Sequence, residues 1–376
     1  MLALASIPTI VAQQTGIAAH AIGYQVSLIY GAAMIVSAFA GGLVKRFGSA
    51  RVAQAALYVA AAGLLALAGG TVPAMFFGSV LIGCTYGCTN PPASHILKRV
   101  TPARLRNLVY SIKQAGVPIG GVLAALSMPL LADHVGWRGA LLVFAAAVLA
   151  LALCFQPLRA RWDSDRTPGL PLGGSVVKNQ RLLWTAPGMT ALAALGLLFS
   201  ALQLCVSAFT VAMLIEEFGW SPLKAGAMAA SVQVCGAVGR IAWGVVADWV
   251  GSGFAVLSGL GAAMALCCVL LAFGPHLPPA ATILVLGAMG LTAVGWNGVL
   301  LAETARLSPG RTGTLTGEVL VYTFAGVMIG PSGFSAIYSS IGSYAATFGL
   351  LGALALTGMV VAALAHRAQA NRGSPA

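Results

Sequence analysis

The sequence predicts an all-α membrane protein of twelve transmembrane helices in two six-helix halves, and three observations support this. Charged residues make up only 7% of the 376-residue chain and hydrophobic residues 59%, whereas a soluble domain carries about 25% charged residues. Apolar runs recur along the whole chain, and its first half resembles its second half. A single soluble core does not bury this much apolar surface, so lipid is the expected solvent.

Twelve apolar segments are expected to be helices, because crossing about 30 Å of hydrocarbon takes roughly 20 apolar residues with every backbone polar group satisfied internally. Their predicted ranges are 2–12, 24–44, 52–69, 73–97, 108–131, 139–157, 187–212, 223–247, 253–273, 280–302, 317–338 and 345–365. The first segment is short, since about 11 helical residues span only about 16 Å. We therefore expect helix one to be incomplete, with the true start of the chain about 10–20 residues upstream.

Basic residues are distributed unevenly between two alternating sets of connections, and this predicts the orientation of the helices. Sixteen lysines and arginines fall in one set and two in the other, while Lys113 and Arg240 lie within apolar runs. Cytoplasmic connections carry an excess of Lys and Arg, so the first set is expected in the cytoplasm. Both termini of a multi-pass chain in a bacterial-type inner membrane are then cytoplasmic, and no cleavable signal peptide is expected.

The longest connection predicts the division of the chain. It runs from about Leu158 to Trp184, carries five basic residues and includes the stretch TPGLPLGG, which is typical of a flexible linker. The expected organisation is an N-terminal half at 1–157, a cytoplasmic linker at 158–186, a C-terminal half at 187–366 and a cytoplasmic tail at 367–376.

An internal repeat relates the two halves. Segments four and ten match at an offset of 207 residues, segments five and eleven share AGVxIG at 210, and the ends of segments two and eight share G-x-x-x-x-x-x-G-S at 203. The offset of about six helices keeps both halves in the same orientation, as in transporters built from parallel repeats. The matched pairs include Gly83–Gly290, Thr85–Thr292, Asn90–Asn297, Arg99–Arg306, Pro102–Pro309 and Arg104–Arg311.

The connection after segment two carries a resemblance to a known family. GGLVKRFGSAR at Gly41–Arg51 is similar to the G-x-L-x-D-R-x-G-R-R loop of the major facilitator superfamily, and GVVADWVGS at Gly244–Ser252 is a weaker second copy. This resemblance covers essentially the whole chain and implies two bundles around a central cavity that open alternately to either side. The glycines are expected to permit a tight turn. The motif residues are Gly41, Lys45, Arg46, Gly48, Arg51, Gly244, Asp248 and Gly251.

The chain departs from the family pattern at one charged position. The acidic residue of the first copy is Lys45 here, while the second copy keeps Asp248. In the family this carboxylate helps to latch the halves on the cytoplasmic side, so Lys45 puts the latch of the first half in question. The arginine found early in helix four of proton-driven drug exporters is also missing, and GVPIGG in segment five matches the exporters' motif only in part.

Ionisable residues within the apolar runs are the main candidates for function, because charge inside a membrane is costly. Lys113 and Arg240 would form an anion site, with arginine offering a bidentate fork; the alternative for both is snorkelling to the headgroups. GRIAWGVVADWVG resembles helix eight of organic-anion and monocarboxylate porters, which implies a substrate role for Arg240. Glu318 is either a proton carrier with a pKa raised by burial or the partner of an arginine.

Neutral polar residues supply weaker candidates for the substrate site. They lie on helices that line the cavity in the family or beside the two cations, but such a residue more often forms a hydrogen bond between helices than a contact with a ligand. Asn90 and Asn297 occupy the same repeat position, which favours a shared role in packing. The full set is Tyr86, Asn90, Gln114, Gln203, Gln233, Trp296 and Asn297.

Several classes of function are disfavoured. The seven cysteines lie in apolar runs at spacings that match no zinc or disulfide pattern, so we expect no metal and no cofactor. No Walker loop is present, and no catalytic cluster indicates an enzyme. The basic charge follows topology, so no nucleic-acid partner is expected.

The leading hypothesis is a monomeric secondary transporter, a symporter or antiporter, whose partners are the bilayer, a small organic anion and a coupling proton. One alternative is an exporter of hydrophobic or cationic compounds. Such an exporter is expected to carry an acidic residue deep in the first half, and segments one to six contain none. Another is a non-transporting membrane sensor on the same fold, which would usually add a soluble domain.

Overall fold

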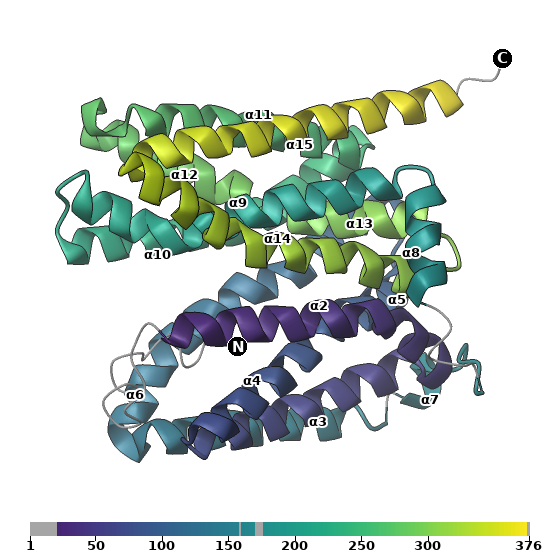
Figure 1. The fold of residues 1–376 in the computed structure, drawn as a ribbon. Helices are drawn as coiled ribbons and strands as arrows, with labels where there is room; N and C mark the ends of the chain where they lie inside the picture. The colour runs from purple at the N-terminus through teal and green to yellow at the C-terminus, as the bar shows by residue number, and fades with distance from the viewer. Residues whose placement is uncertain (1–20, 158, 170–175, 374–376) are drawn as a thin grey trace. The chain divides into compact units, whose positions relative to one another are not determined.

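The computed structural model describes residues 21–157, 159–169 and 176–373, and this part of the chain is helical without strands. Eleven of its helices or helix pairs are long and apolar enough to cross a membrane (Figure 1). They correspond to predicted segments two to twelve, which confirms the predicted all-α membrane fold. The first predicted segment, 2–12, lies outside the described residues.

The N-terminal half begins with helices separated by short turns. Gly48, at φ 96°, separates the first two helices, and Thr71 starts the third by accepting a hydrogen bond from the amide of Ala74 at 3.4 Å. Gly136 interrupts the last helix with φ 72° and ψ 158°, so predicted segments five and six form one element with a kink. The elements are α2 (Ala21–Phe47), α3 (Ser49–Ala68), α4 (Val72–Gly87), α5 (Asn90–Val100), η2 (Ala103–Leu105) and α6 (Arg106–Cys154).

The remaining elements include two helices in the connection that the sequence predicts to be a flexible linker. These are α7 (Arg159–Trp162) and α8 (Val176–Thr185). The described part of the linker is therefore largely helical, because polar residues before and after the Gly/Pro stretch dock on neighbouring helices, as shown below. The C-terminal half consists of α9 (Met189–Glu216), α10 (Pro222–Val250), α11 (Gly253–Ala272), η3 (Gly274–His276), α12 (Pro279–Ala293), α13 (Asn297–Leu307), α14 (Thr312–Ile341) and α15 (Tyr344–Gly373).

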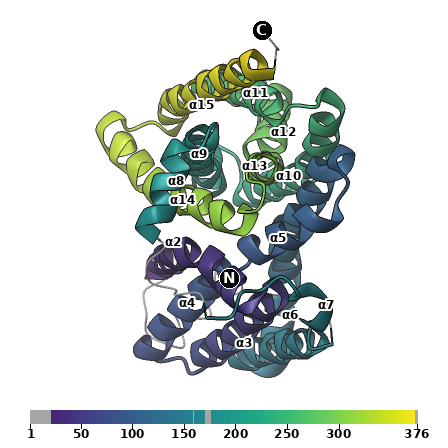
Figure 2. The same cartoon turned by 90° about the vertical axis from the view of Figure 1, so that its right-hand side faces the viewer.

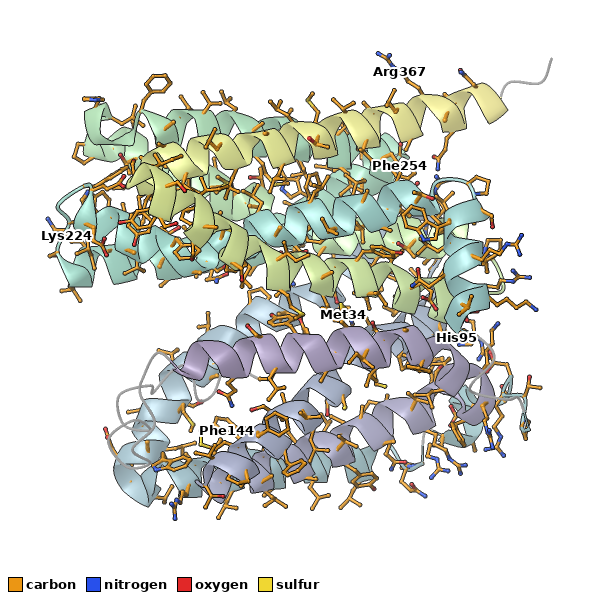
Figure 3. The ribbon with its side chains drawn as sticks, viewed as in Figure 1. Met34, His95, Phe144, Lys224, Phe254 and Arg367 are labelled. Atoms are coloured by element: carbon orange, nitrogen blue, oxygen red, sulfur yellow. The ribbon has the colours of Figure 1, made fainter. Side chains whose placement is uncertain are left out.

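The chain folds into two compact units. Unit 1 contains residues up to 99, 119–183 and 308–321, and unit 2 contains 100–118, 184–307 and 322–376. Within unit 1, α4 packs against both α2 and α3 (Figure 1). Within unit 2, α11 pairs with α15, and α9, α10, α12 and α13 pack together (Figure 2). Phe254 on α11 is fully buried in this packing (Figure 3).

Predicted segments four and ten are each divided into two helices at the same repeat position. The first break lies between α4 and α5 and the second between α12 and α13, immediately before Asn90 and Asn297. Pro91 and Pro92 have no N–H group and cannot continue the hydrogen bonds of α4, which explains the first break. The second break contains no proline.

Helix contacts in the two units follow the sequence repeat. A Cβ atom on Gly83 would lie 2.4 Å from the carbonyl oxygen of Ile29, and one on Gly290 would lie 2.5 Å from that of Val232. Each glycine therefore lets a helix pair approach closely. The two contacts are related by the offsets 207 and 203 seen in the sequence.

Candidate functional site

Arg240 lies in α10 within unit 2 and its side chain is almost fully buried, at 3% exposure. Its Nε atom donates to the carbonyl oxygen of Val294 at 2.9 Å, and Nη1 donates to the carbonyl oxygen of Gln114. Val294 is available as an acceptor because it lies in the break between α12 and α13. The guanidinium therefore holds three helical segments together within unit 2 through backbone acceptors.

Gln114 connects Arg240 with two other candidates. Its side-chain oxygen accepts a hydrogen bond from Lys113 Nζ at 2.7 Å, and its Nε2 atom donates to Asn297 Oδ1. Gln114 itself is buried at 3% exposure. The two cations are close enough to repel each other electrostatically. Lys113, Gln114, Arg240 and Asn297 thus form one positively charged polar cluster, which we call the Arg240 cluster.

Three other predicted residues of unit 2 form two separate polar contacts. The indole N–H of Trp296 donates to Gln203 Oε1 at 3.1 Å, and the fully buried indole lies edge-on to Phe199 with ring centroids 5.8 Å apart. Gln233 Nε2 donates to Ser207 Oγ at 3.4 Å. Gln203 therefore fixes the tryptophan of the helix break, while Gln233 bonds to the neighbouring α9.

Three predicted candidates lie in unit 1. Tyr86 packs edge-on against Tyr30 with centroids 5.7 Å apart, and Asn90 is buried at the first position of α5. Glu318 is fully buried in α14, and its Oε2 atom accepts a hydrogen bond from Gln180 Nε2 at 2.5 Å. Its Oε1 atom has no hydrogen-bond partner among the described residues. Gln180 lies in α8, so the linker supplies the partner of this carboxyl group.

The motif glycines bring two pairs of helices together in the same way. A Cβ atom on Gly41 would lie 2.3 Å from Thr314 Cα in unit 1, and one on Gly244 would lie 2.8 Å from the carbonyl oxygen of Asn107 in unit 2. The following turns contain Gly48 at φ 96° and Gly251 at φ 74°. Backbone in this region favours glycine.

The charged residues of the two motif copies have different contacts. Asp248 accepts hydrogen bonds from the backbone amides of Asn107 and Leu108, at 2.9 and 2.8 Å, and so caps the start of α6. Lys45 is exposed near the start of α14, and Arg311 acts on it as a like charge. Arg46 lies over the ring of Phe47 at 5.2 Å.

Sequence reasoning missed the role of Asp163 in the linker. Its Oδ1 atom accepts from the amide of Ala50 at 2.7 Å and Oδ2 accepts from that of Arg51 at 3.1 Å, which caps α3. Burial raises the pKa of Asp163, although the bond from Ala50 opposes this shift. The only sequence signal was an acidic residue in a basic linker, and it gave no indication of which helix it caps.

The described residues contain no group of three or more His, Cys, Asp or Glu side chains that would hold a metal ion. The residues of the Arg240 cluster themselves offer hydrogen bonds and positive charge in an apolar surrounding.

Comparison with known protein families finds a match to the Major Facilitator Superfamily model over residues 1–321. A relative from Mycobacterium tuberculosis, an uncharacterized MFS-type transporter, is 28% identical over 71% of this chain and 59% of its own length. Rat monocarboxylate transporter 13 is 27% identical over 74% of this chain and 64% of its own length. A probable galactarate/D-glucarate transporter of Escherichia coli is 25% identical over 63% and 60%. The matches thus span less than two thirds of these relatives.

Solved structures with a similar fold include two transporters. The Escherichia coli fucose:proton symporter superposes with a TM-score of 0.74, covering 96% of this chain and 94% of its own at 14% identity. The human organic anion transporter MFSD10 superposes with a TM-score of 0.75, covering 94% and 87% at 18% identity. At these identities the similarity establishes the fold.

Proposed function

Because the chain belongs to the Major Facilitator Superfamily, we propose that it is a secondary active transporter that moves a small organic anion across the membrane by alternating access. It is a multi-pass membrane protein by its helices and its family. The observation that carries the substrate class is the Arg240 cluster, in which two cations converge on Gln114 inside apolar helices.

The geometry of the cluster supports an anion rather than a cation as substrate. A cationic solute would meet two positive side chains, whereas a carboxylate would be attracted to both, and arginine offers the planar fork that suits a carboxylate. The carbonyl oxygens of Val294 and Gln114 hold the guanidinium in place. A pre-positioned cation loses little conformational freedom when the substrate binds.

The relatives support the same substrate class. Two of them are named for the transport of carboxylates, namely monocarboxylates and galactarate or glucarate. A third, the plastidic glucose transporter 4 of Arabidopsis thaliana, is named for a sugar and is 29% identical over 40% of this chain. The longer matches therefore favour the anion.

We propose Glu318 as the proton-coupling group. A buried carboxylate without a cation is costly, and a proton removes that cost. Its carboxyl group is hydrogen-bonded by the neutral side-chain amides of Gln180 and Asn179, and no described basic side chain lies within salt-bridge distance. These contacts favour the proton carrier over the arginine-paired carboxylate.

The remaining features of the proposal concern location and organisation. The asymmetry of basic residues supports a bacterial-type inner membrane location with both termini on the cytoplasmic side. We propose the halves 1–157 and 187–366 as the elements that rock against each other, in a protein that works as a monomer.

The proposal is tested by uptake into proteoliposomes. Labelled mono- and dicarboxylates, a neutral sugar and a cationic dye are presented with and without an inward proton gradient. We expect a carboxylate to be accumulated, and Arg240→Gln to lower its kcat/KM by about 100-fold, since losing one partner of a buried charge contact costs about 2–5 kcal/mol.

The matched control is Lys224→Gln, which removes an exposed cation at the start of the same helix and is expected to leave uptake unchanged. Arg240→Lys keeps the charge without the fork and is expected to retain part of the activity. Size-exclusion profiles and thermal unfolding establish that each variant is folded. Uptake of the dye or the sugar instead of carboxylates, or normal carboxylate uptake by a folded Arg240→Gln variant, would refute the anion site.

A further inference from the structure

Unit 1 contains a cavity of about 570 Å³ lined by basic residues. Small-molecule sites commonly occupy about 300–1,000 Å³, so the cavity has room for a compact ligand. It is lined by the first turn of α14 and by the second half of α5, where Figure 3 labels His95. The ionisable residues of its lining are Lys45, His95, Lys98, Arg99, Asp165 and Arg311.

The lining has a large excess of positive charge. Four lysines and arginines face one carboxylate, and that carboxylate already pairs with Arg99 at 3.1 Å and with His95 at 3.4 Å. Lys45 and Arg311 repel each other. No carboxylate in the described ranges of the chain lies within 4 Å of either. The two cations are therefore uncompensated within the part of the protein that the structure describes.

The second motif copy indicates what would compensate them. Asp248 at the equivalent repeat position accepts two backbone hydrogen bonds at the start of α6. In unit 1 this position is Lys45, while Gly313 and Thr314 at the start of α14 line the same cavity. The first copy thus keeps the glycine contact between Gly41 and Thr314 but has replaced the anionic group by a cation.

We propose that this cavity binds a phosphate-bearing anion, which supplies from outside the negative charge that Asp248 supplies from within the chain. Lys45 and Arg311 would contact the phosphate oxygens, because arginine binds phosphate bidentately and lysine binds it as a point charge. The phosphate belongs either to a soluble anion or to the headgroup of an acidic lipid. The site is separate from the Arg240 cluster, so the inference does not depend on the transported solute.

The test is ligand-dependent thermal stability. The purified protein in a neutral detergent is titrated with inorganic phosphate or with chloride at equal ionic strength, and separately placed in phosphatidylcholine nanodiscs with or without phosphatidylglycerol. We expect phosphate, phosphatidylglycerol or both to raise Tm by on the order of 2–4 °C, since a ligand stabilises the state that binds it. A response to phosphate identifies a soluble anion, and a response only to phosphatidylglycerol identifies a lipid.

Variants decide whether the response comes from this cavity. The double variant Lys45→Gln/Arg311→Gln is expected to lose the rise in Tm, and Lys45→Asp is expected to lose it as well while raising Tm without any ligand. The control is Arg104→Gln, because Arg104 is the repeat counterpart of Arg311 outside the cavity lining. An equal response in wild type and the double variant, or no response of the wild type to either phosphate source, would overturn the proposal.

Discussion

The two repeat copies share a packing frame but differ in the polar residues placed on it. In unit 1, Gly87 approaches Ala33, so that a Cβ atom would lie 2.6 Å from its carbonyl oxygen. In unit 2 the equivalent pair is Val294 and Gly236, and a Cβ atom on Gly236 would lie 2.4 Å from Val294 Cγ1. The large and small partners have exchanged sides. Each pair therefore keeps one glycine at the contact, while the other partner is larger in unit 2, where it is Val294, than in unit 1, where it is Ala33.

Equivalent polar positions in the two copies carry side chains that differ strongly in size and charge. Ser37 in unit 1 is fully buried and donates to the carbonyl oxygen of Met34 on its own helix, at 2.9 Å. Its repeat counterpart is Arg240, which binds Val294 and Gln114. A serine satisfied within its helix needs no partner, whereas a buried guanidinium needs several. The second copy therefore carries a buried cation, Arg240, where the first carries a serine, as the proposed anion site requires.

The same comparison singles out Glu318, whose repeat counterpart at the offset of 210 is Leu108. Glu318→Gln should abolish accumulation driven by a proton gradient while leaving exchange of labelled for unlabelled substrate intact, because glutamine preserves the shape and the contact with Gln180 but does not carry a proton. Proteoliposome uptake with an imposed pH gradient, alongside counterflow without one, measures both. This is the largest effect we expect.

Glu303→Gln is the control for that experiment. Glu303 is equally buried, at 1% exposure, but is paired with Arg306 through bonds of 2.9 and 2.5 Å. We expect this variant to lower Tm without uncoupling transport from the proton gradient. If it uncouples transport and Glu318→Gln does not, the assignment of the coupling group is wrong.

The helix packing that the two copies share is tested most directly by substituting the repeated glycines. Gly83→Ala and Gly290→Ala should each destabilise the protein by about 1–3 kcal/mol, because the added methyl group would overlap a backbone carbonyl of the facing helix. Thermal unfolding followed by tryptophan fluorescence measures the loss. Gly287 lies on α12 with Gly290, and a Cβ atom there would have its nearest neighbour 4.0 Å away. Gly287→Ala should therefore be nearly neutral. Equal Tm values for the three variants would mean that the close approach carries no energetic weight.

Much of this frame was predictable from the sequence. Apolar length predicted the spans, and the repeat predicted that Gly83 and Gly290 occupy equivalent positions, which the structure shows as equivalent close contacts. These features depend on local composition and on period, which one sequence displays. The resemblance at Gly41–Arg51 also indicated the motif turns, where Gly48 has a positive φ.

The site itself was predictable only in part. Lys113 and Arg240 were identified as unusual, but Gln114 as their connector was not, since its contacts join helices that are far apart in the sequence. The helix break at Val294, whose carbonyl oxygen accepts from Arg240, was missed as well. The break lacks proline and left no mark in the apolar pattern. Long-range caps were missed for the same reason, because Asp163 meets the amide of Ala50 across more than a hundred residues.

The difference between Asp248 and Lys45 predicts a difference in stability. Asp248→Ala should cost about 0.5–2 kcal/mol, the range for losing an N-cap, because two amides of α6 lose their acceptor. Lys45→Ala removes an exposed like charge beside Arg311 and should be neutral or slightly stabilising in detergent without phosphate. Both are measured as shifts in Tm. A loss at Lys45 as large as at Asp248 would contradict the interpretation that only the second copy is capped from within.

The smallest expected effect concerns the two helix breaks. Trp296 and Thr89 occupy the same repeat position, each in a helix break. Trp296 is buried and donates to Gln203, whereas Thr89 is exposed and donates to the carbonyl oxygen of Thr85 in the preceding helix α4, at 2.9 Å. Trp296→Phe keeps the ring beside Phe199 and removes one hydrogen bond, so it should cost about 0.5–1.5 kcal/mol. Thr89→Ala should stay within about 0.5 kcal/mol of wild type. Because Phe lacks the indole fluorophore, the comparison is made by differential scanning calorimetry. A larger loss of stability in Thr89→Ala than in Trp296→Phe would show that the first break, not the second, depends on a side-chain contact.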